Sequence, residues 1–129
     1  MNSTKTDAKE TFGSYLRFLL NKYGHKSKDI AHLLGFRPPY ISDVLAGNNK
    51  PFKLGDLEKI VKQMPWSQKE VESLYDLAGQ ERNEIAPDLM ALAKDSKQVH
   101  NLLRIIKRNK ISEKQLQQIC ESLSSKGWK

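Results

Sequence analysis

Apolar side chains recur along this chain with the spacing of an α-helix. The first stretch places them three or four residues apart, at Phe12, Leu16, Leu19, Leu20 and Tyr23, which aligns them on one helical face. Similar stretches follow through the rest of the sequence. No persuasive alternation of apolar and polar residues, the mark of a half-buried strand, interrupts them. The pattern therefore predicts an all-α protein.

The ends of the predicted helices carry residues that stop or start helices. Gly24, Gly35 and Gly47 each follow an apolar-periodic stretch, and glycine commonly ends a helix. Ser67 and Ser112 are each followed three residues later by Glu or Gln, which is the spacing of a capping box. These signals predict five helices in the larger, N-terminal part of the chain and about three short ones after it.

A change in composition at residues 80–87 separates two modules. This segment is polar, lacks apolar periodicity and contains a proline, as linkers commonly do. We therefore expect a five-helix domain at residues 10–79 and a helical module at residues 88–125. A module of roughly 40 residues buries too little surface to be stable alone, so we expect it to pack against a second copy. The residues assigned to this homodimer interface are Leu102, Leu103, Ile106, Leu116, Ile119 and Leu123.

The charge of the chain suggests a polyanionic partner. Lys and Arg total 22 against 15 Asp and Glu, giving a net charge of +7, and such an excess favours nucleic-acid binding. Between residues 22 and 53 only two acids oppose the cations, which are Lys22, Lys26, Lys28, Arg37, Lys50 and Lys53. A second basic cluster lies at residues 107–110. Either cluster can alternatively be an ordinary solvated helix face.

Enzymatic, metal-binding and membrane-spanning classes find no support in the sequence. The histidines and Cys120 lack the spacing of a metal site, and no catalytic constellation or glycine-rich phosphate loop is present. No apolar run approaches the roughly 20 residues of a membrane span, and the polar N-terminus lacks a signal-peptide core. A single cysteine fits a reducing compartment. We expect a cytoplasmic protein that is not an enzyme and needs no cofactor or metal.

Residues 27–64 carry a motif with a recognisable spacing. Its elements are Ile30, Ala31, Gly35, Phe36, Tyr40, Ile41, Ser42, Val44 and Gly47, followed by Pro51, Leu54, Leu57, Ile60 and Val61. This spacing resembles the helix-turn-helix of the Xre family, the phage-repressor and Cro-like transcriptional regulators. The resemblance implies a five-helix, lambda-repressor-like DNA-binding domain. In such relatives the second motif helix lies in the major groove and the first crosses the phosphate backbone.

The spacing of the motif has a physical basis. Two helices that cross steeply need a small residue, here Ala31, where their backbones approach, and Gly35 where the chain turns through positive φ. Ile41 and Val44 then anchor the second helix to the core and leave its other face free.

Carried over by position, the resemblance assigns twelve residues to DNA contact. They are Lys26, Ser27, Lys28, Arg37, Pro38, Pro39, Tyr40, Asp43, Asn48, Asn49, Lys50 and Lys53. Several depart from the family pattern: Ser27 replaces a phosphate-binding glutamine, Arg37 replaces a Ser or Thr cap, and prolines stand at base-reading positions. The buried Arg–Glu pair of many relatives is replaced by Leu20 and Leu45, a type of change that is often neutral or stabilising.

The double proline leaves two interpretations open. Pro38 precedes another proline, which disfavours the α region, so we expect a non-helical Pro38 and a helix that begins at Pro39. The prolines either contact thymine methyl groups or only start the helix, with specificity then coming from Tyr40, Asp43 and DNA shape.

The leading hypothesis is a sequence-specific transcriptional regulator, in particular a repressor of a mobile element or stress regulon. It would bind a pseudo-palindromic operator as a dimer. The architecture resembles regulators of which some are inactivated when a metallopeptidase cuts the C-terminal module, so such a peptidase is a candidate partner. The alternative is an antitoxin or adaptor whose helix-turn-helix domain mainly binds protein, because Asp43 and the unusual recognition helix weaken the expected electrostatics.

Overall fold

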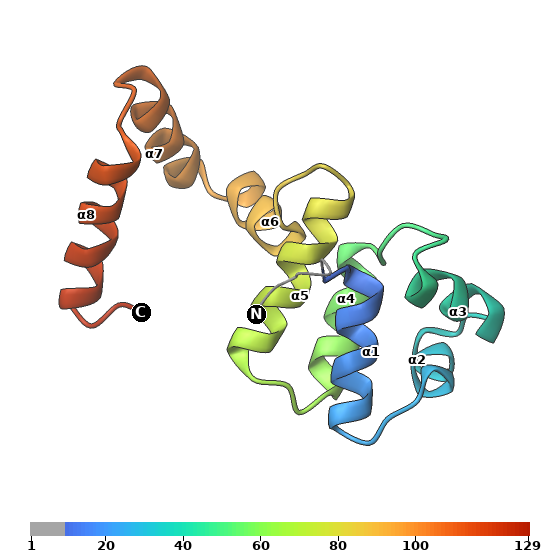
Figure 1. The fold of residues 1–129 in the computed structure, drawn as a ribbon. Helices are drawn as coiled ribbons and strands as arrows, with labels where there is room; N and C mark the ends of the chain where they lie inside the picture. Colours follow the sequence, from blue (N-terminus) through green and yellow to red (C-terminus); the bar gives the residue numbers. More distant parts are fainter. Residues whose placement is uncertain (1–9) are drawn as a thin grey trace. The chain divides into compact units, whose positions relative to one another are not determined.

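A computed structural model describes residues 10–129 as helices joined by short loops, with no strand in that range (Figure 1). The described part of the chain is therefore all-α, as predicted. The chain forms two compact units, the first ending at Met90 and the second spanning Ala91–Lys129. The helices are α1 (Phe12–Lys22), α2 (Ser27–Leu34), α3 (Pro38–Ala46), α4 (Leu54–Gln63), α5 (Gln68–Glu81), α6 (Pro87–Asp95), α7 (Lys97–Arg108) and α8 (Glu113–Ser125).

Most helix ends follow the signals in the sequence. Gly35 and Gly47 close α2 and α3 with φ of 74° and 84°, a left-handed conformation that glycine adopts without steric cost. Ser67 and Ser112 form the predicted capping boxes at the starts of α5 and α8. Because these signals are local, they place the helix boundaries without reference to the tertiary fold.

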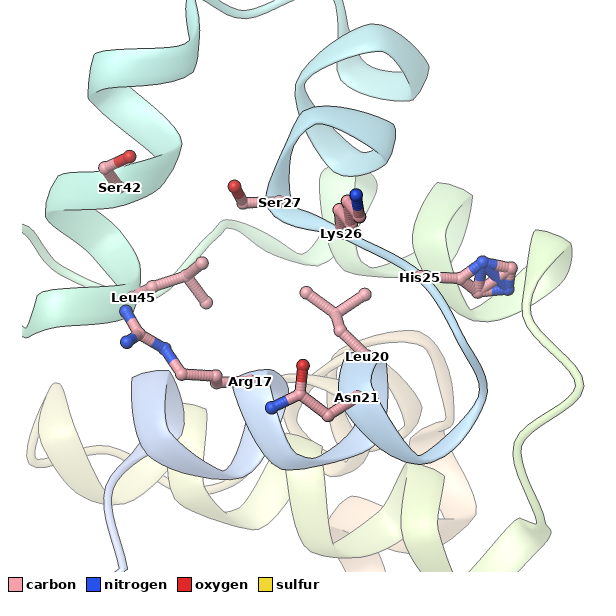
Figure 2. A pocket seen from close by; sticks show the side chains of 8 residues that line it. All are labelled: Arg17, Leu20, Asn21, His25, Lys26, Ser27, Ser42 and Leu45. Atoms are coloured by element: carbon pink, nitrogen blue, oxygen red, sulfur yellow. The ribbon is translucent and has the colours of Figure 1, made fainter.

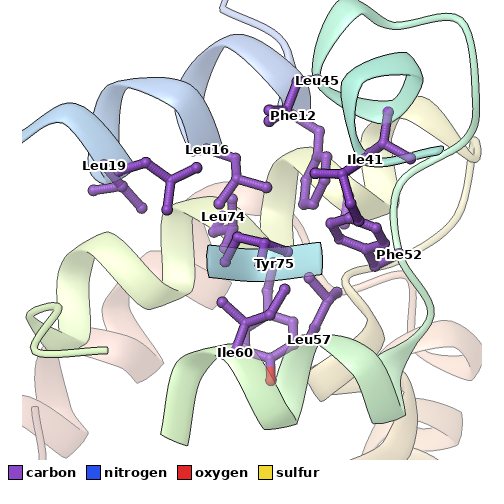
Figure 3. Close-up of a cluster of buried hydrophobic side chains, with 14 of the residues drawn as sticks. Phe12, Leu16, Leu19, Ile41, Leu45, Phe52, Leu57, Ile60, Leu74 and Tyr75 are labelled. Carbon is purple, nitrogen blue, oxygen red and sulfur yellow. The ribbon is translucent and has the colours of Figure 1, made fainter. Parts of the chain in front are cut away.

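The core of the first unit is built from the apolar faces of α1 to α5 (Figure 3). Helix α1 packs against α3 and α5, and α2 packs against α3 and α4. Burial of each large apolar side chain contributes roughly 1.5–3 kcal/mol to stability, so this core holds α2 and α3 firmly in place. The most deeply buried side chains are Phe12, Leu16, Leu19, Ile30, Ile41, Val44, Phe52, Leu57, Ile60 and Leu74.

The start of α3 differs from the sequence prediction. Pro38 and Pro39 are the first two helical residues, and Arg37 is the extended residue before them, with φ −74° and ψ 142°. Arg37 thus meets the restriction that a following proline imposes. Pro38 accepts helical geometry because its φ is already close to the helical value and the first N–H groups of a helix have no intrahelical acceptor. The expectation of a non-helical Pro38 is therefore wrong.

Part of the segment expected to be a linker contributes to the first unit. Helix α5 continues to Glu81, whose carboxylate accepts a hydrogen bond from the Phe12 N–H at the start of α1. Arg82 Nη2 donates to the Pro51 carbonyl oxygen at 2.7 Å, and Ala86 is buried. The segment lacks apolar periodicity because it contributes mainly polar and backbone contacts. The compact units divide after Met90, which is later than the composition suggests.

The second unit leaves its apolar side chains open. The predicted short helices of the C-terminal module include α7 and α8, and α8 begins directly after Ser112, as its capping box predicts. No residue from 91 to 129 is fully buried. Leu102 and Leu103 of α7 are 57% and 50% exposed, and Ile119 of α8 is 46% exposed. Each helix therefore carries an apolar face that its own unit does not cover.

Candidate nucleic-acid interface

Helices α2 and α3 are joined by a short turn that begins at Gly35 and lie beside each other within the first unit (Figure 1). Ala31 of α2 is buried, as are Ile41 and Val44 of α3. These residues fasten one face of α3 to the core. The opposite face of α3 is exposed, and its residues are Pro38, Pro39, Ser42, Asp43 and Ala46. The structure thus presents one long face of α3 to solvent.

The first turn of α3 is apolar and rigid. Tyr40 packs edge to face against Phe36 and Phe52, with ring centroids 4.9 Å and 6.1 Å apart. Neither Pro38 nor Pro39 offers an N–H, so the Tyr40 N–H, which donates to the Arg37 carbonyl oxygen at 3.0 Å, is the first donor of the helix. This end of α3 therefore offers apolar contact surface in place of free backbone N–H donors.

Arg37 stands immediately before this apolar turn. It occupies the position of the helix cap, and its side chain makes no capping hydrogen bond. The side chain is exposed. Its guanidinium is therefore available to an external acceptor, such as a phosphate oxygen or a guanine edge.

An open hollow of about 400 Å³ lies on one side of α3. Figure 2 shows that its side chains come from α1, the loop after α1, α2 and α3, and that Leu20 and Leu45 point toward each other across it. No acidic side chain is among the lining residues, which are Arg17, Leu20, Asn21, His25, Lys26, Ser27, Ser42 and Leu45. The two cations, the amide and the two hydroxyls make this hollow suitable for an anion.

The same hollow is lined by two buried leucines. Leu20 and Leu45 are 2% and 8% exposed, so neither position places a charge in the core, and no cost of desolvating a buried ion pair arises there. Arg17, one turn before Leu20 on α1, supplies one of the two cations of the hollow.

A second hollow, of about 480 Å³, lies beside the first turn of α3. It brings together four residues assigned to DNA contact, Tyr40, Asn49, Lys50 and Lys53. Phe36, Pro51, Asp56 and Arg82 complete its lining. Arg82 is fixed by its hydrogen bond to Pro51, and Asp56 offsets part of the local positive charge. Cationic side chains therefore stand on both sides of the exposed face of α3.

The remaining predicted residues lie near these two hollows without lining them. Lys28 and Asp43 are exposed on α2 and α3. The Asn48 N–H donates to the Asp43 carbonyl oxygen at 2.8 Å and helps to end α3. The Asp29 carboxylate accepts the Lys26 N–H at 2.8 Å. The Asp29 carboxylate thus accepts the N–H of the residue before α2, and its negative charge is favourable at the N-terminal end of the helix.

Sequence reasoning missed several residues of this surface, among them Arg17, Asn21, Ser42 and Arg82. Arg17 and Asn21 lie four residues apart on α1, beside Leu20, and this polar spacing was the available signal. Ser42 follows Pro39 by three residues and therefore shares its face of α3. Nothing in the sequence indicated that Arg82 belongs to this surface, because only the tertiary fold brings it to Pro51.

Three of the described groups whose pKa values are shifted, Lys22, Tyr23 and Glu70, form a separate cluster between α1 and α5, and the buried Tyr75 lies outside it. Glu70 accepts hydrogen bonds from Lys22 Nζ at 2.6 Å and from the Tyr23 hydroxyl at 2.7 Å. These bonds, with that from the Ser67 N–H, lower the pKa of Glu70 to about 2. The same contacts with Glu70 raise the pKa values of Lys22 and Tyr23, and burial raises that of Tyr75. The cluster joins the end of α1 to the start of α5.

Within residues 10–129, no group of three or more His, Cys, Asp and Glu side chains is arranged to hold a metal ion. No described helix is both long and apolar enough to cross a membrane. No protein-family model, curated protein or solved structure matches this chain.

Proposed function

We propose that this chain is a sequence-specific DNA-binding regulator that acts as a homodimer. The observation that carries the proposal is the exposed face of α3, which has cationic hollows on both sides and is anchored to the core through Ile41 and Val44. An anchored helix with an open face and cations beside it has the elements needed to enter a major groove and hold the adjacent phosphates.

The proposed division of labour follows from the chemistry of each side chain. Arg17, Lys26 and Ser27 hold a phosphate on one side of α3, and Lys50 and Lys53 hold phosphates on the other. These contacts fix the register of the protein on the duplex and carry no sequence information. The sequence is read by the exposed side chains of α3, with Asp43 accepting from a cytosine amino group and the prolines contacting thymine methyl groups.

The resemblance of residues 27–64 to the Xre family supports the same proposal and adds its oligomeric form. A second copy covers the open apolar faces of α7 and α8, and two first units occupy the half-sites of a pseudo-palindromic operator. Occupancy of the operator excludes polymerase, so the chain represses transcription. A metallopeptidase that cuts the C-terminal unit would relieve repression by separating the half-site readers.

One observation favours a second candidate, an antitoxin or adaptor that binds protein through this same surface. Phe36 and Tyr40 are each 36% exposed beside two exposed prolines, and apolar and aromatic patches are common at protein interfaces. The nearby Asp43 would repel DNA phosphates. This alternative leaves the cations around α3 unexplained, and we therefore rank it second.

A salt titration on random-sequence duplex DNA tests the proposal. Each phosphate neutralised by a Lys or Arg adds about −0.9 to the slope of log K against log salt. The cations beside α3 should therefore give a steep negative slope, with tighter binding to a selected operator. A flat salt response, or no binding to any duplex at low salt, would remove the DNA proposal and favour the protein-binding candidate.

A further inference from the structure

Helix α7 carries a cationic face that the proposed function does not use. Between Ser96 and Ser112 the sequence contains five Lys or Arg residues and no Asp or Glu. Four of the cations fall on α7, and with His100 they occupy one side of the helix, because at about 100° per residue their five positions fall within an arc of about 100°. The members of this cationic face are Lys97, His100, Arg104, Lys107 and Arg108.

The cationic face includes a small hollow. His100, Leu103, Arg104 and Lys107 surround an open space of about 200 Å³. A phosphate group placed there would meet a guanidinium, an ammonium and an imidazole, while Leu103 closes the apolar side. Arginine and lysine are the usual partners of phosphate oxygens in proteins.

No acidic side chain within the described residues forms a salt bridge with a cation of this face. The stability of α7 explains only some of the cations on this face. Lys107 and Arg108 lie in the last turn of α7, where cations interact favourably with the helix dipole. Lys97 lies at the opposite end, where a cation is unfavourable, and Arg104 lies between the two ends. The helix dipole therefore does not account for Lys97 or Arg104.

We propose that this cationic face of α7 is a second, sequence-independent contact with the phosphate backbone of duplex DNA. The identity of the polyanion rests on the proposed function of the first unit. When a second copy covers the apolar faces of α7 and α8, the cationic face lies on the other side of α7 and stays accessible. Each C-terminal unit then adds binding energy and a steeper salt dependence without changing which sequence is preferred.

An anionic membrane is the other polyanion that a basic amphipathic helix can bind. Two observations favour DNA. The apolar face of α7 contains leucine, isoleucine and valine but no aromatic residue, whereas interfacial helices commonly insert Trp or Phe. The adjacent α8 carries two acids, Glu113 and Glu121, and one cation, Lys114. It therefore gains little from an anionic surface.

The test compares two triple variants of the full-length chain on a random-sequence duplex of about 40 base pairs. The first variant, Arg104→Gln, Lys107→Gln and Arg108→Gln, removes three cations from the face. The control, Lys114→Gln, Lys126→Gln and Lys129→Gln, removes the same charge from exposed positions of α8 and the C-terminus. We expect the first variant alone to reduce the magnitude of the salt slope by about 2–3 for each protomer on the duplex, and to bind at least about tenfold more weakly.

Two further measurements keep the result interpretable. Glutamine has nearly the helix propensity of lysine and arginine, and circular dichroism should show equal helix content in both variants. A variant that keeps the charge, with Arg104→Lys and Arg108→Lys, should retain most of the affinity and the salt slope. Loss of binding in this charge-retaining variant would overturn the proposal of a phosphate-backbone contact.

The outcomes separate the inference from the function on which it rests. If the unmodified chain binds no duplex, the proposed function and the inference both fail. If the unmodified chain binds but the two triple variants behave alike, only the inference fails. Vesicles containing 30% phosphatidylserine form the last arm. If the first variant loses binding to these vesicles but binds DNA as the control does, the face is a membrane contact and the inference is overturned.

Discussion

The backbones of α1 and α3 meet at Gly13 and Leu45. A Cβ atom added to Gly13 would lie 2.8 Å from the carbonyl carbon of Leu45 and 2.9 Å from the carbonyl oxygen of Val44, and closer still to the Leu45 oxygen. Real Cβ atoms do not approach backbone atoms so closely, and the obstacle is backbone, which cannot rotate away. Glycine at position 13 therefore sets the distance between α1 and the helix proposed to read DNA.

The Gly13→Ala substitution should destabilise the protein although alanine is the better helix former. Relief of the overlap requires α1 and α3 to separate, and overpacking of this kind costs about 1–3 kcal/mol. Gly55→Ala in α4 is the matched control. Gly55 has no neighbour within 4 Å of an added Cβ, so that variant should be stabilised by about 0.5–1 kcal/mol. Urea unfolding monitored by circular dichroism measures both, and equal effects of the two substitutions would contradict the close contact.

Arg37→Ala and Lys50→Ala should each weaken DNA binding by a similar factor on every sequence. Both side chains are exposed beside α3. Lys50 is proposed to hold a phosphate, and of the two acceptors open to Arg37, a phosphate oxygen and a guanine edge, we assign it the phosphate, which carries no sequence information. Each variant should reduce the magnitude of the salt slope by about 0.9 per protomer, or about 1.8 for the dimer. Fluorescence anisotropy on a selected operator and on random duplex provides the comparison. A loss confined to the operator would instead place the altered residue on a base.

Asp43→Ala should have a different effect, because an ionised carboxylate only accepts hydrogen bonds and repels phosphates. The variant should bind random duplex at least as well as the unmodified chain, and it should lose about 1–3 kcal/mol of discrimination at one base pair. Selection of bound fragments from random DNA by both proteins identifies that position. Uniformly weaker binding, as expected for Arg37→Ala, would exclude Asp43 from base readout.

The fold could be predicted from the sequence wherever the signal is local. Three kinds of signal act within a few residues of one another. They are the apolar residues three or four positions apart, the capping boxes at Ser67 and Ser112, and the glycines after α2 and α3. The prediction of a non-helical Pro38 was wrong. A following proline favours an extended conformation at Arg37 as well as at Pro38, and the extended Arg37 alone is enough to lead the chain into α3. The contribution of Glu81 to the first unit depends on Phe12, which lies far away in sequence.

The candidate site was predictable only where it coincides with one sequence motif. Lys26, Ser27 and Lys50 lie in or beside the motif helices, and the structure places them at the two hollows beside α3. Arg17 and Arg82 belong to other helices or to the segment after α5. They join the surface through the packing of α1 and α5, which apolar spacing alone does not specify.

Removal of apolar side chains from the second unit should dissociate the proposed dimer. Leu102 and Ile119 are about half exposed, and burial of such a side chain contributes roughly 1.5–3 kcal/mol. Leu102→Gln with Ile119→Gln should raise the dimer dissociation constant by more than about tenfold. Lys114→Gln, an exposed substitution on α8, is the control. Sedimentation equilibrium over a range of concentrations measures the change, and an unmodified chain that stays monomeric at high concentration would contradict the dimer.

The contact of Glu70 with Lys22 and Tyr23 makes stability depend on pH in the acid range. In the folded chain the pKa of Glu70 is about 2, below its ordinary value of 4.5, so the unfolded chain binds a proton more readily. A lowered pKa contributes stability above pH 4.5, and this contribution is lost as pH falls from about 4.5 toward 2.

Glu70→Gln should therefore be less stable than the unmodified chain at pH 6, and the difference should shrink as the pH approaches 2. Glutamine still serves at the third position of a capping box, so the substitution removes the charge while it keeps the cap of α5. Glu72→Gln, which removes an exposed carboxylate from the same helix, is the control. Urea unfolding at a series of pH values measures the difference. A deficit of Glu70→Gln that persists unchanged at pH 2 would show that the charge contact with Lys22 and Tyr23 is not its cause.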